Sequence, residues 1–140
     1  MAELTGGAER TFDATTDAIG RARRFVRASA SNALERADRG RDLAGDLELA
    51  VSELVTNAIE YGRAEPVTVS IVEHVAPARV VVSVRSARTS SGITDPTTWS
   101  SPLPAVRTGR GLAIVRSVSD EVEVEADAST VTVRCVFHLE

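Results

Sequence analysis

The sequence contains no lysine, and its sixteen basic residues are all arginine. This absence excludes a Walker-type phosphate loop, a Schiff-base lysine and a pyridoxal site, because each of them requires a lysine side chain. Cysteine is nearly absent as well, since Cys135 is the single cysteine of the chain. One cysteine forms neither an internal disulfide nor a thiolate zinc cluster, so we expect Cys135 to be a small buried apolar residue.

Long apolar runs and a surplus of positive charge are also missing. No run approaches the about 18 apolar residues of a membrane-spanning helix. The first residues, Met1 to Gly7, lack the basic and apolar regions of an export signal. We therefore expect no membrane association and a cytoplasmic location. The net charge of −4 and the pI near 5.3 argue against a nucleic-acid-binding protein.

The 140 residues, 43% of them apolar and 26% charged, have the size and composition of one globular domain. We expect residues 1–9 to be a flexible terminus and residues 10–140 to form the domain. The local exception to the acidic balance is a cluster made of Arg21, Arg23, Arg24 and Arg27. This cluster is either a solvated helix face or a docking surface for an acidic protein.

The hydrophobic pattern predicts an α/β fold with two layers. Apolar residues at spacings of three and four predict helices from Thr15 or Thr16 to about Leu34, from Asp42 to about Tyr61, and from Gly111 to Val118. Alternating apolar and polar residues predict strands at 10–14, 67–73, 80–86, 121–126 and 131–139. We expect a mixed, mostly antiparallel sheet of about five strands, covered on one face by about three helices.

The predicted helix 42–61 contains the first candidate site residues. Its apolar residues form one broad stripe, which consists of Leu43, Leu47, Ala50, Val51, Leu54, Ala58 and Tyr61. Glu53, Asn57 and Glu60 recur at the same spacing on the flank of that stripe. A polar row at the margin of a buried face is placed to line the floor of a pocket.

Further candidates lie at the end of the predicted hairpin and after it. Ser86 ends the strand 80–86, on the same side as its alternate valines. The segment that follows is rich in Ser, Thr and Pro, and its length is typical of a lid, which we expect at about 87–110. Gly109 and Gly111, with Arg110 between them, lie at the start of the next predicted helix, and a Gly-x-Gly sequence before a helix is by itself also typical of a flexible loop end.

In the order of its elements and in two segments, the chain resembles the anti-sigma-factor serine/threonine-protein kinases of bacterial partner-switching systems. The segments are Ser52-Glu53-Leu54-Val55-Thr56-Asn57-Ala58-Ile59-Glu60-Tyr61-Gly62 and Thr108-Gly109-Arg110-Gly111-Leu112-Ala113-Ile114-Val115. Those kinases belong to the histidine-kinase-like ATPase superfamily, which has the Bergerat fold. The resemblance extends from about Arg10 to Leu139.

The resemblance implies ATP and Mg²⁺ as cofactors. Asn57 would coordinate Mg²⁺ through its side-chain oxygen, and Glu53 would orient or deprotonate the attacking hydroxyl. One amide oxygen suffices because Mg²⁺ takes phosphate and water oxygens as its other ligands, and a nearby carboxylate can accept the proton of a serine nucleophile. The phosphates would be bound by Gly109, Arg110, Gly111 and Leu112.

The adenine-binding box departs from the pattern of this family. The family has an aspartate at the end of the hairpin's second strand, which accepts a hydrogen bond from the adenine amino group, and a small residue two places later. This chain has Ser86 and Arg88 at these places. A neutral acceptor in place of a charged one lowers the hydrogen-bond contribution from about 1.5–3 to about 0.5–1.5 kcal/mol, roughly a tenfold loss of affinity.

Three functions fit these observations. The first is an anti-sigma regulatory factor that binds ATP with Mg²⁺ and phosphorylates a serine on an anti-sigma antagonist, thereby controlling sigma-factor availability. The second is a nucleotide-deficient binding module of the same fold, which regulates a partner protein by contact alone. The third is an α/β domain with an unrelated role, in which Glu53 and Asn57 are solvated. Relatives commonly form homodimers, but the sequence identifies no surface for one.

Overall fold

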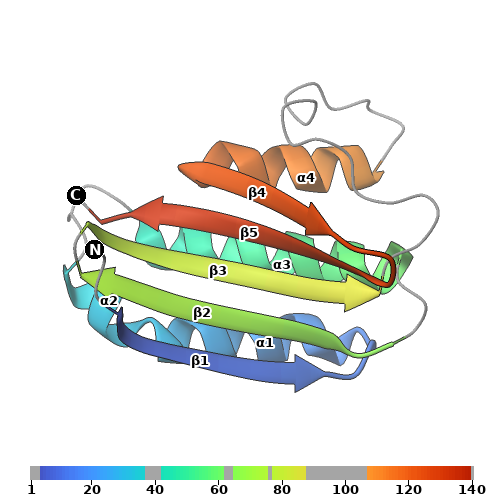
Figure 1. The fold of residues 1–140 in the computed structure, drawn as a ribbon, viewed down its shortest axis with the longest axis horizontal. Coiled ribbons are helices and arrows are strands. Elements are labelled where there is room, and N and C mark those ends of the chain that lie inside the picture. Colours follow the sequence, from blue (N-terminus) through green and yellow to red (C-terminus); the bar gives the residue numbers. More distant parts are fainter. Residues whose placement is uncertain (1–3, 37–41, 62–64, 76, 88–106, 140) are drawn as a thin grey trace.

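The computed structural model describes residues 4–36, 42–61, 65–75, 77–87 and 107–139. The elements, in chain order, are β1 (Leu4–Phe12), α1 (Asp17–Ser29), α2 (Ser31–Arg36), α3 (Leu43–Tyr61), β2 (Val67–Val75), β3 (Ala78–Ala87), α4 (Arg107–Val118), β4 (Glu121–Ala126) and β5 (Thr130–His138). The strands form one five-stranded sheet in the order β1-β2-β3-β5-β4. The helices lie together on one face of this sheet (Figure 1).

This architecture confirms the predicted two-layer α/β fold. The sheet differs from the predicted mixed one, because each pair of described neighbouring strands is antiparallel. For two of these pairs, β2 with β3 and β4 with β5, the connection is only a few residues long, and a connection of this length joins antiparallel strands. The described helices number four instead of three, because the first predicted helix is divided into α1 and α2.

The hydrophobic core lies between the helices and the sheet face that they cover. Helix α3 contacts α1 on one side and α4 on the other, and it packs on β3 and β5. Alternate residues of β3, from Ala78 through Val84 to Ser86, are buried against this layer. The predicted face of the strand is therefore correct, and Ser86 points to the helix side of the sheet.

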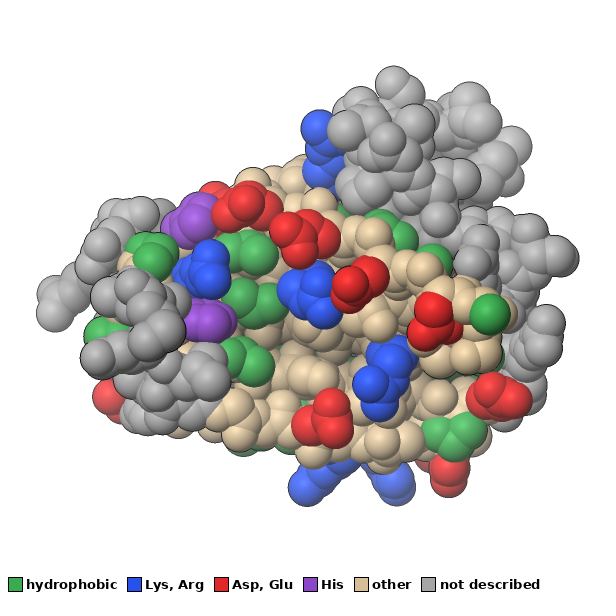
Figure 2. Space-filling view, viewed as in Figure 1, with side chains coloured by type: hydrophobic (Ala, Val, Ile, Leu, Met, Phe, Trp, Pro, Cys, Tyr) green, Lys and Arg blue, Asp and Glu red, His purple; other side chains and the backbone are tan. Residues whose placement is uncertain are grey.

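The other face of the sheet presents charged side chains together with some hydrophobic ones and is covered by no helix of the described part of the chain (Figure 2). Arg134 lies between two acidic side chains of β4, 3.6 Å from Glu123 and 3.4 Å from Glu125. His138 Nε2 lies 3.1 Å from Glu121 Oε2. These cross-strand pairs are solvent-exposed, so we expect each of them to contribute little to stability.

Strand β1 begins earlier than predicted. Residues 4–9, expected to belong to a flexible terminus, lie in the strand and pair with β2, with Gly7 opposite Val72 and Glu9 opposite Ser70. The low strand propensity of Gly6 and Gly7 argued against this pairing. The backbone hydrogen bonds available along the nine-residue strand β2 outweigh that propensity.

The predicted helix from Thr15 or Thr16 to Leu34 is interrupted at Ala30, which has φ −94° and ψ 11°. The buried carboxylate of Glu73, on β2, accepts a hydrogen bond from the backbone N–H of Ala33 at 2.7 Å. In a continuous helix this N–H would bond to the carbonyl of Ser29. The acceptor lies 40 residues away in the sequence, so the local pattern could not predict the break.

The remaining boundaries are mostly as predicted. Asp42 caps α3, because its Oδ1 accepts a hydrogen bond from the N–H of Gly45 at 3.0 Å. Asp127 forms the predicted turn between β4 and β5 by accepting hydrogen bonds from the N–H groups of Ser129 and Thr130, which lower the pKa of its carboxyl. No helix in the described residues is both long enough and apolar enough to cross a membrane.

Candidate functional site

The candidate nucleotide site lies at one end of the molecule. Figure 1 shows that α3 and β3 end on this side, at the right of the view, and that α4 begins there. Helix α3 contacts both α4 and β3. The fold therefore brings the segments that contain Asn57, Ser86 and Gly109 to the same end, although they are far apart in the sequence.

Asn57 and Glu53 lie one helical turn apart on α3. The side chain of Asn57 is 7% exposed, whereas Glu53 is half-buried and Glu60 is exposed. Leu54 and Ala58, from the apolar stripe, are buried in the core beside them. The polar row of Glu53, Asn57 and Glu60 thus runs from the edge of the core toward solvent, and Asn57 is its most buried residue.

Three polar side chains are buried in the described part of the chain: Asn57, Glu73 and Ser86. The burial of Glu73 has a structural explanation, namely its hydrogen bond to Ala33. The buried side-chain atoms that lack a hydrogen-bond partner in the described residues are His74 Nδ1 and Arg79 Nε, which belong to the open face of the sheet. Asn57 and Ser86 are candidates for contact with a ligand because they are polar, nearly buried and lie on α3 and β3 near the start of α4.

Ser86 lies near the end of β3, opposite Val131 of β5, and is 8% exposed. Its hydroxyl belongs to the helix-facing side of the sheet, which is the side on which α3 contacts β3. Arg88, the second departure from the adenine box, lies outside the described residues, as does most of the predicted lid.

The glycine segment lies inside α4. The helix begins at Arg107, one turn before the predicted start at Gly111, so Gly109, Arg110, Gly111 and Leu112 all have helical backbone. A glycine in a helix costs only about 1 kcal/mol relative to alanine, so the sequence permits this longer helix. Gly109 lies in the first turn, where backbone N–H groups have no acceptor within the helix. The predicted side-chain contact of Arg110 lies outside what the structure describes.

The histidines and the cysteine lie elsewhere. His74 pairs with Arg79 on the open face of the sheet, and both its burial and the charge of Arg79 lower its pKa. His138 lies opposite Arg79 on the next strand, and Figure 2 shows the histidines together at the left of the view. Burial raises the pKa of the Cys135 thiol to about 12, so Cys135 is protonated at neutral pH. The carboxylates of the polar row on α3 are Glu53 and Glu60.

The structure also contains a groove that the sequence did not predict. It lies between β1 and α1, has a volume of about 980 Å³ and is lined by Arg10, Thr11, Phe12, Asp13, Thr15, Asp17, Ala18, Arg21, Arg24, Phe25, Ala28 and Ser29. The spacing of Asp17, Arg21, Arg24 and Ala28 on one side of α1 is the sequence signal that could have indicated it.

Comparisons with known proteins agree with this fold. The crystal structure of the RsbU and RsbW domains of Rv1364c from Mycobacterium tuberculosis is similar to this chain, with a TM-score of 0.69 and 22% sequence identity. The similarity covers 96% of this chain and 33% of that one, so the chain spans about a third of the length of the protein that it matches. No curated protein matches the chain. The family described as the histidine kinase-like ATPase domain matches residues 12–137, and the chain therefore belongs to this family.

Proposed function

We propose that the chain is an anti-sigma regulatory factor that binds ATP with Mg²⁺ at the end of the molecule where α3 ends and α4 begins. The proposal is supported by membership of the histidine kinase-like ATPase domain family. It is also supported by the two segments that resemble anti-sigma-factor kinases and by the similarity to a structure that includes an RsbW domain. A sigma factor and an anti-sigma antagonist are the partners that we propose.

The observation on which the proposal chiefly depends is the burial of the Asn57 amide. This polar side chain is only 7% exposed and lies beside the buried core residues Leu54 and Ala58. It lies on α3, which contacts α4, the helix whose first turn contains Gly109. An amide oxygen can coordinate Mg²⁺, and the N–H groups of a helix N-terminus can donate hydrogen bonds to phosphate oxygens. The two together therefore suit a phosphate group that carries Mg²⁺.

The residues at this end fit ATP and Mg²⁺ in type and in order. Asn57 would hold Mg²⁺ through Oδ1, and the N–H groups of the first turn of α4 would hold phosphate oxygens. Ser86 would accept a hydrogen bond from the adenine amino group. Bound Mg²⁺ would neutralise the negative charge of the phosphates. Glu53, one turn from Asn57, would accept the proton of a serine hydroxyl on the antagonist.

Isothermal titration with ATP in the presence of Mg²⁺ tests this proposal. We expect saturable binding by the parent chain and about a tenfold or greater loss of affinity for Asn57→Ala, because a metal ligand is removed. Thr56→Ala is the matched control, since Thr56 is an adjacent polar residue on α3 outside the row of Glu53 and Asn57. Equal affinities of parent and Asn57→Ala would contradict the proposed role of Asn57.

A specific observation favours a second function, the nucleotide-deficient binding module. Ser86 is a neutral acceptor at the place where the related kinases have aspartate, and the expected cost is roughly tenfold in affinity. A parent chain that shows no ATP binding, yet forms a complex with a sigma factor, would support this second function. Phosphate transfer to an antagonist that is lost in Glu53→Gln would support the kinase.

A further inference from the structure

Three basic side chains lie next to one another on the open face of the sheet. His74 of β2 lies directly opposite Arg79 of β3, and Arg79 lies directly opposite His138 of β5. Adjacent strands are about 4.8 Å apart, so Arg79 lies between two histidines whose Cα atoms are about 10 Å apart. Figure 2 shows the two histidines of the chain at the left of the view, with a basic side chain between them. We refer to these three residues as the basic row.

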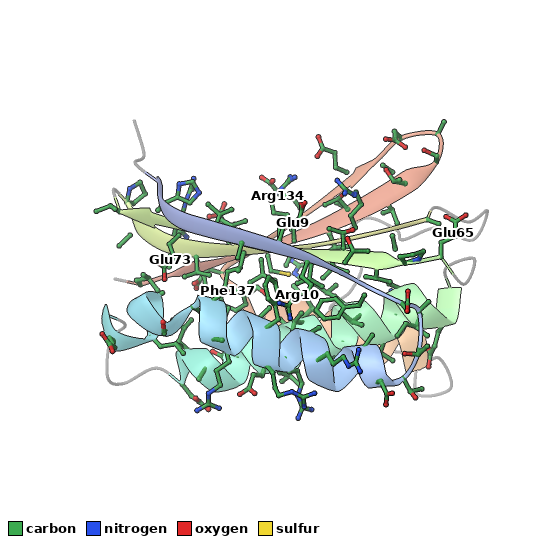
Figure 3. The ribbon with its side chains drawn as sticks, turned by 90° about the horizontal axis from the view of Figure 1, so that it is seen from below. Glu9, Arg10, Glu65, Glu73, Arg134 and Phe137 are labelled. Carbon is green, nitrogen blue, oxygen red and sulfur yellow. The ribbon has the colours of Figure 1, made fainter. Side chains whose placement is uncertain are left out.

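The basic row points away from the helices. Glu73 and Phe137, which are strand neighbours of His74 and His138, lie on the helix side of the sheet (Figure 3). Successive residues of a strand point to opposite faces, so both histidines point to the open face. Arg79 shares this face, because it alternates with the buried residues of β3.

Two atoms of the basic row are buried without a hydrogen-bond partner in the described part of the chain, namely His74 Nδ1 and Arg79 Nε. A buried N–H group without an acceptor is costly. A neutral imidazole has one N–H group, so His74 avoids this cost when its proton is on Nε2, which leaves Nε2–H as its donor. The guanidinium group of Arg79 stays protonated, so a ligand oxygen at its Nε edge would supply the missing acceptor.

The positive charge of the basic row is balanced at one end only. His138 Nε2 lies 3.1 Å from Glu121 Oε2, and the backbone N–H of His138 donates a hydrogen bond to Asp120 Oδ2 at 2.7 Å. Among the described residues, no carboxylate forms an ion pair with His74 or Arg79. The charge of Arg79, together with burial, lowers the pKa of His74. Basic residues directly opposite each other destabilise a sheet unless an anion lies between them.

A second arginine on the same face has different surroundings. Arg134 has two carboxylates nearby, at 3.6 Å from Glu123 and 3.4 Å from Glu125. The open face therefore pairs an arginine with carboxylates next to β4, whereas Arg79 lies between histidines. This difference indicates that the acceptor for Arg79 comes from outside the described part of the chain.

Apolar side chains border the basic row. Val72, Val81 and Val136 lie opposite one another on β2, β3 and β5, two residues along each strand from the basic row and on the same face. Val136 is only 7% exposed. An apolar border of this kind keeps water away from one side of the basic row and strengthens its interaction with an anion.

We propose that the basic row binds a doubly charged oxyanion of the phosphate class, either free phosphate or a phosphate monoester. Arg79 donates to two of its oxygens, and His74 donates from Nε2 to a third. A carboxylate has two oxygens, which Arg79 alone can satisfy, so donors on adjacent strands favour a tetrahedral anion. In a monoester, the organic group lies on the valines that border the basic row.

NMR titration with sulfate, followed by backbone amide and imidazole signals, tests the proposal. Sulfate has the shape of phosphate and stays doubly charged between pH 6 and pH 8. We expect saturable shifts at the basic row, which chloride at equal ionic strength does not reproduce. Binding should be tighter at pH 6 than at pH 8, because protonated histidines attract the anion. This pH dependence should be absent in His74→Gln/His138→Gln.

Two arginines of β3 provide a matched pair of variants. Arg79→Gln should lose about tenfold or more in sulfate affinity, because charge-assisted hydrogen bonds are removed. Arg85→Gln removes the same charge from the same face of the same strand, between Thr68 and Thr132, and should stay within about twofold. Arg79→Lys keeps the charge without the planar fork and should lose less than Arg79→Gln. Absence of saturable binding, equal shifts with chloride, or equal losses for Arg79→Gln and Arg85→Gln would overturn the proposal.

Two further ligands distinguish the sources of the oxyanion. Tighter binding of phenyl phosphate than of inorganic phosphate would identify a monoester as the ligand, because the phenyl group would contact the valines. Equal or weaker binding of phenyl phosphate would identify free phosphate. Binding of neither ligand would overturn the proposal.

The basic row is separate from the proposed nucleotide site. Arg79 lies at the start of β3, whereas Ser86 lies near its end and on the other face of the sheet. Sulfate titration of Asn57→Ala should therefore match that of the parent chain. Sulfate binding without ATP binding would refute the nucleotide proposal alone. ATP binding that is lost in Asn57→Ala, without sulfate binding by the parent chain, would refute the basic-row proposal alone.

Discussion

Buried polar side chains lie at two ends of this molecule, and the two ends differ in what those side chains contact. At the end where β2 meets α2, Glu73 is buried because it accepts a hydrogen bond from Ala33. At the other end, Asn57 and Ser86 are buried on α3 and β3 near the start of α4, and we propose that they contact a ligand there. The comparison teaches that burial alone does not identify a functional residue.

The largest expected effect is at the structural end. Glu73→Ala should lower the free energy of unfolding by about 1–3 kcal/mol, because the buried N–H of Ala33 loses its acceptor. Glu73→Gln keeps a side-chain carbonyl and should lose less. Urea unfolding monitored by circular dichroism measures both changes. A loss for Asn57→Ala as large as that for Glu73→Ala would remove the distinction between the two ends.

The second-largest expected effect is a change in the affinity for ATP at the end that contains Asn57 and Ser86. Ser86→Asp should increase the affinity for ATP by roughly tenfold, because a charged acceptor replaces a neutral one. The gain should be smaller for GTP, which lacks the amino group at the corresponding position. Calorimetric titration with both nucleotides measures the difference. Equal changes for ATP and GTP would show that Ser86 does not contact the base.

The smallest expected effect is on the free energy of unfolding at high pH, and it arises from Cys135, which is buried in the hydrophobic core. Burial raises the pKa of Cys135 to about 12 from an ordinary value of 9.0. A group whose pKa is raised by folding stabilises the protein fully below the unfolded pKa, and this stabilisation is lost as the pH rises toward the folded pKa. We therefore expect the free energy of unfolding to fall by about 1 kcal/mol between pH 9 and pH 10.

The control for this pH effect is Cys135→Ala, whose stability should change less over the same interval. The chain has no lysine and one tyrosine, so few other groups titrate there. Urea unfolding at pH 8, 9 and 10 gives the slopes. Identical slopes for parent and variant would contradict the burial of the thiol.

Local sequence patterns predicted much of the fold and the placement of individual candidates. Spacings of three and four placed the buried stripe of α3, and strand alternation placed Ser86 on the helix-facing side of β3. These patterns depend on near neighbours in the chain, which a sequence displays directly. The cap of α3 at Asp42 was predicted for the same reason.

The incorrect boundaries depend on contacts between distant residues. The break at Ala30 depends on Glu73, and the early start of β1 depends on pairing with β2. The groove beside β1 requires α1 and the sheet edge to be placed together, which spacing within α1 cannot specify. Which arginines of α1 are free is likewise a tertiary property, since Arg27 is paired through Glu48 of α3.

A structure of the chain with Mg²⁺ and a non-hydrolysable ATP analogue tests the central claim most directly. We predict Mg²⁺ at about 2.1 Å from Asn57 Oδ1, the usual distance for an oxygen ligand, and phosphate oxygens at the N–H groups of the first turn of α4. A nucleotide bound elsewhere, or an Asn57 amide that contacts only protein groups in the presence of saturating nucleotide, would contradict it.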